Sequence, residues 1–185
     1  MISVSGRYYR MLNKPASADS ALLGKALGQV DEYSEEPALA AAGGIMSNVA
    51  AEGTQVHAVS GMEGTLVAAD VEGSLRVFQR VSFNGKALKG QEKLEDTLKL
   101  KGHIRSMTLS GTGTVSDAGA CEQLFGTLLA AASYEGSGSL TGRQTLHIEL
   151  DNGLTVQLMI RDDKLAACGV WSCPEFMEAF AAAVQ

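Results

Sequence analysis

The sequence predicts an α+β fold in which an antiparallel β-meander sheet carries helices packed on one face. Short runs rich in β-branched residues are separated by tight turns such as Asn84-Gly85 and Asn152-Gly153, which favour hairpins. Apolar residues also recur at helical spacing, most clearly over residues 117–132. Because hairpin turns connect neighbouring antiparallel strands, these observations indicate an α+β rather than a doubly wound α/β fold.

At 185 residues, with 45% hydrophobic and 19% charged residues, the chain is expected to form one domain over 1–185. A chain of this length buries about 70% of its unfolded surface. Residues 54–82 align with residues 144–172 without a gap, and His57 then lies opposite His147. This match suggests a duplicated unit of a strand, a helix and three strands, with similar halves at about 1–95 and 96–185. The alternative is that any two amphipathic meanders match this well.

The N-terminal third is predicted to contain one strand and two helices. Residues 1–13 mix apolar and polar positions, which favours a strand. Pro15 and Ser17 precede a helix that we expect from Asp19, because apolar residues follow at helical spacing: Leu22, Leu23, Ala26, Leu27 and Val30. Pro37 suits the first turn of a second helix over 38–53, although Gly43-Gly44 weakens it.

The middle of the chain is predicted to be a meander. Strands are expected within 54–60, 65–70 and 74–83, followed by the Asn84-Gly85 turn, a return strand over 86–90 and a polar excursion over 91–96. The alternating pattern of residues 97–109 then predicts one long strand. Its apolar side is expected to carry Leu98, Leu100 and Ile104.

The C-terminal part contains the clearest helix. Ser116 or Asp117 can act as its N-cap, and one face carries Cys121, Leu124, Phe125, Leu128, Leu129 and Ala132. A small-residue connector over 133–143 leads to three strands within 144–172, with turns at Asn152-Gly153 and Asp162-Asp163. Alternation assigns the following residues to the core face of these strands: Leu146, Ile148, Leu150, Leu154, Val156, Leu158, Ile160 and Leu165. A capping box over 172–175 opens a last helix with an inner face of Phe176, Met177, Phe180 and Val184.

Charge and hydropathy exclude several classes of function. The net charge is −6 and the basic residues are scattered, so the chain lacks the positive patch that binds a phosphate backbone. No run reaches the roughly 18 apolar residues of a membrane-spanning helix, and the first residues lack the apolar core of a signal peptide. We therefore expect no nucleic-acid partner, no membrane span and a cytoplasmic location, with leaderless secretion as the alternative.

No residues are assigned to a catalytic, cofactor-binding or metal site. His57, His103 and His147 lie on different predicted strands without a ligand-spacing motif, and His147 alternates with apolar neighbours, which places it on the polar face. The loop over 136–143 lacks the lysine of a phosphate loop, and residues 110–119 fit a linker with an N-cap better than an anion site.

The remaining reactive side chains also have ordinary interpretations. The three cysteines form no C-x-x-C pair and are expected to be buried thiols: Cys121, Cys168 and Cys173. A nucleophile formed by Cys121 or Cys168 with His147 is the alternative. The acidic pairs Glu35-Glu36 and Asp162-Asp163 fall in turns or breaks and are expected to be solvated, and Trp171 is predicted to be a core aromatic whose N–H lies near an edge.

The order of elements resembles two classes of binding protein. Helix 117–132, strands 144–171 and helix 173–184 resemble the last part of roadblock-type dimerising modules, in which a helix and an antiparallel sheet build an adaptor platform. Residues between Val81 and Ser110 have no counterpart there. Helices alternating with strands in a small acidic protein are also similar to bacterial secretion chaperones, which bind unfolded client segments, although this chain is longer than they usually are. Neither resemblance assigns a family.

These resemblances imply a non-enzymatic adaptor or chaperone-like protein. It would bind another protein, or itself as a homodimer, through an antiparallel sheet and an acidic surface that favours a basic or amphipathic partner. A small-molecule carrier with an apolar pocket, and a hydrolase or transferase with a Cys–His site, are the alternatives.

Overall fold

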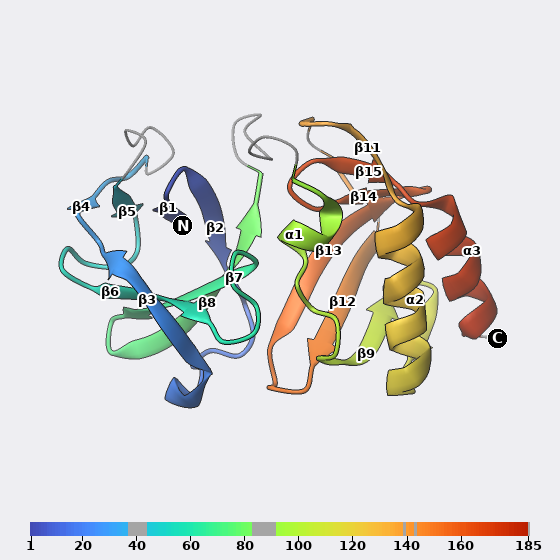
Figure 1. Ribbon diagram of the computed structural model, residues 1–185, viewed down its shortest axis with the longest axis horizontal. Helices are drawn as coiled ribbons and strands as arrows, with labels where there is room; N and C mark the ends of the chain where they lie inside the picture. Colours follow the sequence, from blue (N-terminus) through green and yellow to red (C-terminus); the bar gives the residue numbers. More distant parts are fainter. Residues whose placement is uncertain (37–43, 83–91, 139, 143, 185) are drawn as a thin grey trace. The chain divides into compact units, whose positions relative to one another are not determined.

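The computed structural model describes residues 1–36, 44–82, 92–138, 140–142 and 144–184. Strands dominate, and the chain divides into two compact units, Met1–Ala87 and Leu88–Gln185 (Figure 1). One sheet is mixed and the other is antiparallel, so the α+β class is confirmed at this level. The single domain over 1–185, its division into similar halves near residue 95 and the duplication of these halves stay predictions.

The first unit contains an eight-stranded sheet with the order β3-β6-β7-β8-β2-β1-β5-β4. A short 3-10 helix over Ser20–Leu22 precedes β3. All neighbouring strands are antiparallel except β4 and β5. The strands are β1 Ile2–Val4, β2 Arg7–Met11, β3 Leu23–Gln29, β4 Glu32–Tyr33, β5 Ile45–Ser47, β6 Gln55–Val59, β7 Leu66–Val71 and β8 Ser74–Val81.

This sheet closes on itself through the residues between its end strands, β3 and β4, because their backbone bonds to both sides of the sheet. Val30, between β3 and β4, donates its N–H to the carbonyl of Thr54 at 2.9 Å and accepts from the N–H of Gly53. The next residue, Asp31, donates its N–H to the carbonyl of Ile45 at 2.8 Å. Segment 23–33 therefore joins the β6 side of the sheet to the β5 side.

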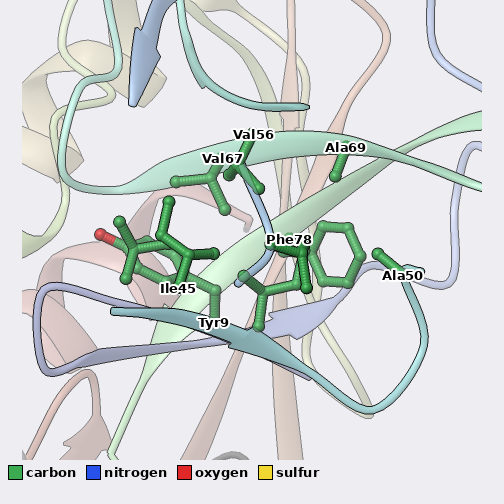
Figure 2. Packing of buried hydrophobic residues seen from close by; sticks show 10 residues of the cluster. Tyr9, Ile45, Ala50, Val56, Val67, Ala69 and Phe78 are labelled. Atoms are coloured by element: carbon green, nitrogen blue, oxygen red, sulfur yellow. The ribbon is translucent and has the colours of Figure 1, made fainter. Parts of the chain in front are cut away.

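The interior of the closed sheet is an aliphatic core around Phe78. Figure 2 shows side chains from opposite parts of the sheet pointing toward one another. Burying such side chains stabilises the fold by about 1.5–3 kcal/mol each. The cluster consists of Ile2, Val4, Tyr9, Val30, Ile45, Ala50, Val56, Val67, Ala69 and Phe78.

Sequence predictions for this unit succeed in its meander and fail at its helices. The runs within 54–82 form β6, β7 and β8 as an antiparallel meander, as predicted. The helix predicted from Asp19 is wrong, since this region forms the 3-10 turn and β3. Residues 37–43, the Asn84-Gly85 turn and the return strand over 86–90 lie outside the described residues, but 45–47 form β5 rather than part of the second predicted helix.

The second unit contains a seven-stranded antiparallel sheet with the order β10-β9-β12-β13-β14-β15-β11. Helices α2 and α3 pack against each other, and α2 also packs against β9 (Figure 1). The elements are α1 Leu94–Thr97, β9 Ile104–Leu109, β10 Gly113–Val115, α2 Ala118–Ala131, β11 Ser133–Gly136, β12 Gln144–Leu150, β13 Thr155–Arg161, β14 Lys164–Ala166, β15 Val170–Ser172 and α3 Pro174–Ala183.

The predicted helix over 117–132 is confirmed as α2. The Asp117 carboxylate accepts the N–H of Ala120 at 2.8 Å as its N-cap, and the helix buries Cys121, Leu124, Phe125 and Leu128. Helix α3 begins at Pro174 as predicted, but its N-cap is Cys173 without a side-chain hydrogen bond. The predicted capping box is therefore wrong, because a buried thiol occupies the cap position.

The strands of this unit are shorter and more numerous than predicted. Residues 144–172 form four strands instead of three, and their predicted core face is fully confirmed by burial. The long strand predicted over 97–109 is confirmed only as β9, because Thr97 ends α1. The predicted connector over 133–143 begins with β11.

Candidate functional site

The sheet of the second unit carries a polar face. Residues directly opposite each other on neighbouring strands share a side of the sheet. Thr108 on β9 lies opposite Thr114 on one neighbouring strand and opposite His147 on the other. His147 in turn lies opposite Gln157. Parallel rows on the same side consist of Ser106, Glu149 and Thr155, of Thr145, Met159, Ala166 and Val170, and of Arg161, Lys164 and Ser172. We call these residues the polar face.

Hydrogen bonds order the side chains of the polar face. The hydroxyls of Thr108 and Thr114 lie 2.9 Å apart, and the Ser106 hydroxyl donates to the Glu149 carboxylate at 2.8 Å. Lys164 forms an ion pair with Glu135 at 2.6 Å, and the hydrogen bond that its ammonium group donates to this carboxylate raises the pKa of Lys164. The face thus offers fixed donors and acceptors together with one exposed apolar side chain, Met159.

The two edges of this sheet are less suited to binding than its face. Strand β10 has three residues and β11 has four, and the pairing of β11 with β15 is irregular between Tyr134 and Gly136. Short and bulged edge strands hinder the addition of another strand. We therefore take the polar face as the candidate binding surface.

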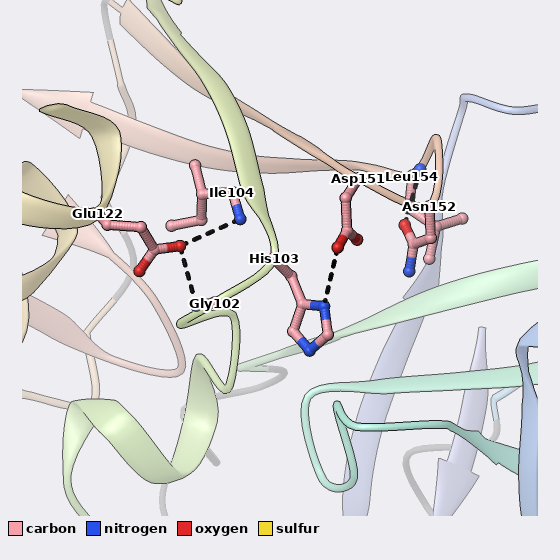
Figure 3. A network of polar contacts seen from close by, with 7 residues as sticks. All are labelled: Gly102, His103, Ile104, Glu122, Asp151, Asn152 and Leu154. Atoms are coloured by element: carbon pink, nitrogen blue, oxygen red, sulfur yellow. Dashed lines mark hydrogen bonds and ion pairs between the residues drawn. The ribbon is translucent and has the colours of Figure 1, made fainter. Parts of the chain in front are cut away.

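A second polar cluster holds the segment that leads into β9. The Glu122 carboxylate on α2 accepts the N–H groups of Gly102 at 2.9 Å and Ile104 at 3.2 Å (Figure 3). The residue between them, His103, places Nδ1 3.3 Å from the Asp151 carboxylate. Two carboxylates from different elements thus fix three consecutive residues, which gives this cluster a structural role.

The three histidines are not assembled into a metal site. His57 belongs to the first unit, where its Nδ1 lies 3.3 Å from the carbonyl oxygen of Gly24. His103 pairs with Asp151, whereas His147 lies in the centre of the polar face. Across the described ranges of the chain, no three His, Cys, Asp or Glu side chains are grouped to hold a metal ion.

The cysteines are buried thiols, as predicted. Burial raises the pKa of Cys173 to about 12, with further contributions from the charges of Asp163 and Glu175. Burial also raises the pKa of Cys121, whose thiol donates to the carbonyl of Val115 at 3.3 Å. Both thiols are therefore protonated at neutral pH, the opposite of what a nucleophile needs.

The predicted core aromatic and the two acidic pairs differ in their surroundings. Trp171 is buried, and its Nε1–H donates to the carbonyl of Ala167 at 2.8 Å, which confirms the predicted core aromatic. Glu35, Glu36 and Asp162 are exposed, whereas Asp163 accepts a hydrogen bond from Ser172 at 3.3 Å. The row of Thr108, His147 and Gln157 was not predicted as a unit, because register between distant strands is not encoded in local alternation.

Comparison with known proteins gives no relative. The chain matches no family model, no curated protein and no solved structure. None of the helices in the described residues has the length and apolar character that crossing a membrane requires.

Proposed function

We propose that this protein binds another protein through the polar face, in a non-enzymatic adaptor or chaperone-like role. The observation that carries the proposal is the division of the second sheet into a buried apolar side and an ordered, partly exposed polar side. As part of this proposal, α2 and α3 both cover the apolar side, which leaves the polar side for a partner. The three buried thiols favour a reducing compartment such as the cytoplasm.

An enzymatic role receives less support. A Cys–His site would need a thiol of lowered pKa next to a base, whereas burial raises the pKa of Cys121, one of the two cysteines considered as the nucleophile with His147. A thiol-reactive probe tests this directly. Selective labelling of one cysteine at neutral pH, abolished by His147→Ala, would support catalysis instead of binding.

The partner surface can be mapped by cross-linking. Lys164 lies on the polar face. Lys93, on the segment before α1 with 77% of its side chain exposed, is the comparison lysine outside this face. Amine-reactive cross-linking followed by mass spectrometry should link Lys164 to a partner protein or to a second copy of this chain. Light scattering after size-exclusion chromatography then shows whether the complex is a homodimer.

A matched pair of variants connects these cross-links with the polar face. Thr155→Arg places a bulky charge on the polar face, and Thr127→Arg places the same charge on α2, where Thr127 is also partly buried. We expect the first variant to lose the Lys164 cross-links and the second to keep them. A monomer that cross-links to no partner, or equal behaviour of both variants, would contradict the proposal. A co-purifying small molecule in native mass spectra would favour the carrier alternative.

A further inference from the structure

The strand segment that closes the first sheet is unusually exposed. Leu27 on β3 is 39% exposed and Tyr33 on β4 is 52% exposed. Among the described residues, large hydrophobic side chains reach such exposure at only two further positions, Tyr134 and Met159. Exposed apolar side chains gathered on one segment commonly mark an interaction surface.

Several glutamates lie close to Tyr33 in the chain or contact its backbone. Glu32 and Glu35 are exposed neighbours in the chain, and Glu36 follows. Glu52 joins them from a separate turn, because its carboxylate accepts the N–H of Tyr33 at 3.3 Å. Residues 26–75 contain eight acidic residues and no lysine or arginine.

No described basic side chain forms an ion pair with these four glutamates. Within the described part of the chain, their charge is therefore not neutralised by an ion pair. The surface that combines Leu27, Tyr33 and these glutamates is called the acidic strand surface.

We propose that the acidic strand surface is a docking site for an extended, arginine- and lysine-rich segment of a partner protein. Charge complementarity selects this occupant, because basic side chains would meet four carboxylates that form no ion pair with a basic side chain among the described residues. The exposed ring of Tyr33 offers a face on which an arginine guanidinium can stack. From Leu27 to Tyr33 an extended chain covers roughly 20 Å, the length of about six residues of peptide.

Side chains, rather than a continuous backbone ladder, would carry this recognition. Strand β3 is an end strand of its sheet, but its pairing with β6 shifts register twice, between Leu23 and Ala26 and between Ala26 and Gly28. Such irregularities hinder the addition of a further strand. The acidic strand surface belongs to the first unit, so this inference goes beyond the proposed use of the polar face and does not depend on it.

The test is a titration of the full chain with a fluorescently labelled twelve-residue peptide of alternating arginine and serine, followed by anisotropy at low salt. We expect saturable binding that weakens as salt is added, and no binding of a peptide with glutamate in place of arginine. Tyr33→Ala should weaken binding about two- to fivefold, the effect of one exposed cation–π contact. The double variant Glu35→Gln/Glu36→Gln should weaken it further at low salt.

Two control variants separate docking from simple attraction to a negatively charged protein. Tyr134→Ala removes another exposed tyrosine, which is 45% exposed and lies beside a glutamate already paired with Lys164. Glu175→Gln/Glu178→Gln removes two exposed charges from α3. Both controls should bind like the parent chain. Absence of binding, or equal losses in the controls and the Tyr33 and Glu35/Glu36 variants, would overturn the proposal.

Discussion

Replacing Gly169 by alanine should destabilise the second unit more than any other glycine-to-alanine change in the turns of its sheet. Gly169 has a φ of +127°, which residues with a side chain rarely adopt. Its added Cβ would lie 2.5 Å from Cε2 of Tyr134 and 3.0 Å from the carbonyl oxygen of Gly136. Both the backbone and the neighbouring ring would therefore have to move.

The magnitude follows from these two effects. A backbone held in a sparsely populated region costs on the order of 1–3 kcal/mol. Displacing the Tyr134 ring also breaks its contact with Trp171, whose centroid lies 5.0 Å away. Such an aromatic pair is worth about 0.5–1.5 kcal/mol. We therefore expect the free energy of unfolding to fall by about 2–4 kcal/mol.

Urea denaturation provides the assay, because the single tryptophan of the chain lies in this contact and reports unfolding by fluorescence. Far-UV circular dichroism should give the same midpoint. In a Tyr134→Ala background the ring clash is absent, so the cost of Gly169→Ala should fall by about 1 kcal/mol. Gly126→Ala is the matched control. Its Cβ meets nothing within 4 Å in α2, and it should stabilise the protein by about 0.5–1 kcal/mol. Loss of less than about 0.5 kcal/mol in Gly169→Ala would refute this reasoning.

Three further predictions concern the core, the polar cluster and pH. Phe125→Ala should lower the free energy of unfolding by about 3–5 kcal/mol in urea titrations, because Phe125 is fully buried. Glu122→Gln should cost about 1 kcal/mol and accelerate hydrogen exchange of the Gly102 and Ile104 amides, which lose a charged acceptor. Because burial raises the pKa of Cys173 from 9.0 to about 12, the folded state keeps its proton to higher pH than the unfolded state. The contribution of this buried thiol to the free energy of unfolding is complete below pH 9. It is lost as pH rises toward 12, by up to about 1.4 kcal/mol per pH unit. Cys173→Ala should remove this part of the alkaline slope in denaturation midpoints measured between pH 8 and 11 at roughly half-unit steps.

Local patterns predicted the second unit better than the first. Strict alternation over β12 and β13 identified Leu146, Ile148 and Val156 as core residues, because these strands have regular pairing and one buried side. The α2 helix was predicted for a similar reason, since one face is buried. The polar face was anticipated only at His147. Its other members come together through pairings such as Thr108 with His147, across nearly forty residues of sequence.

The failed helix over 19–30 has a specific cause in the geometry of β3. Two shifts of register displace the alternation, so that apolar residues recur three or four positions apart, as they would in a helix. Two glycines in this stretch, Gly24 and Gly28, argued against a helix. A Cβ on Gly24 would lie 3.1 Å from the carbonyl oxygen of Ala58, and Gly28 has a φ of +143° beside Ile45. Both glycines are thus required by strand contacts, whereas each would weaken a helix by about 1 kcal/mol. The same irregular strand that imitates a helix in sequence is the one that closes the first sheet and exposes Leu27.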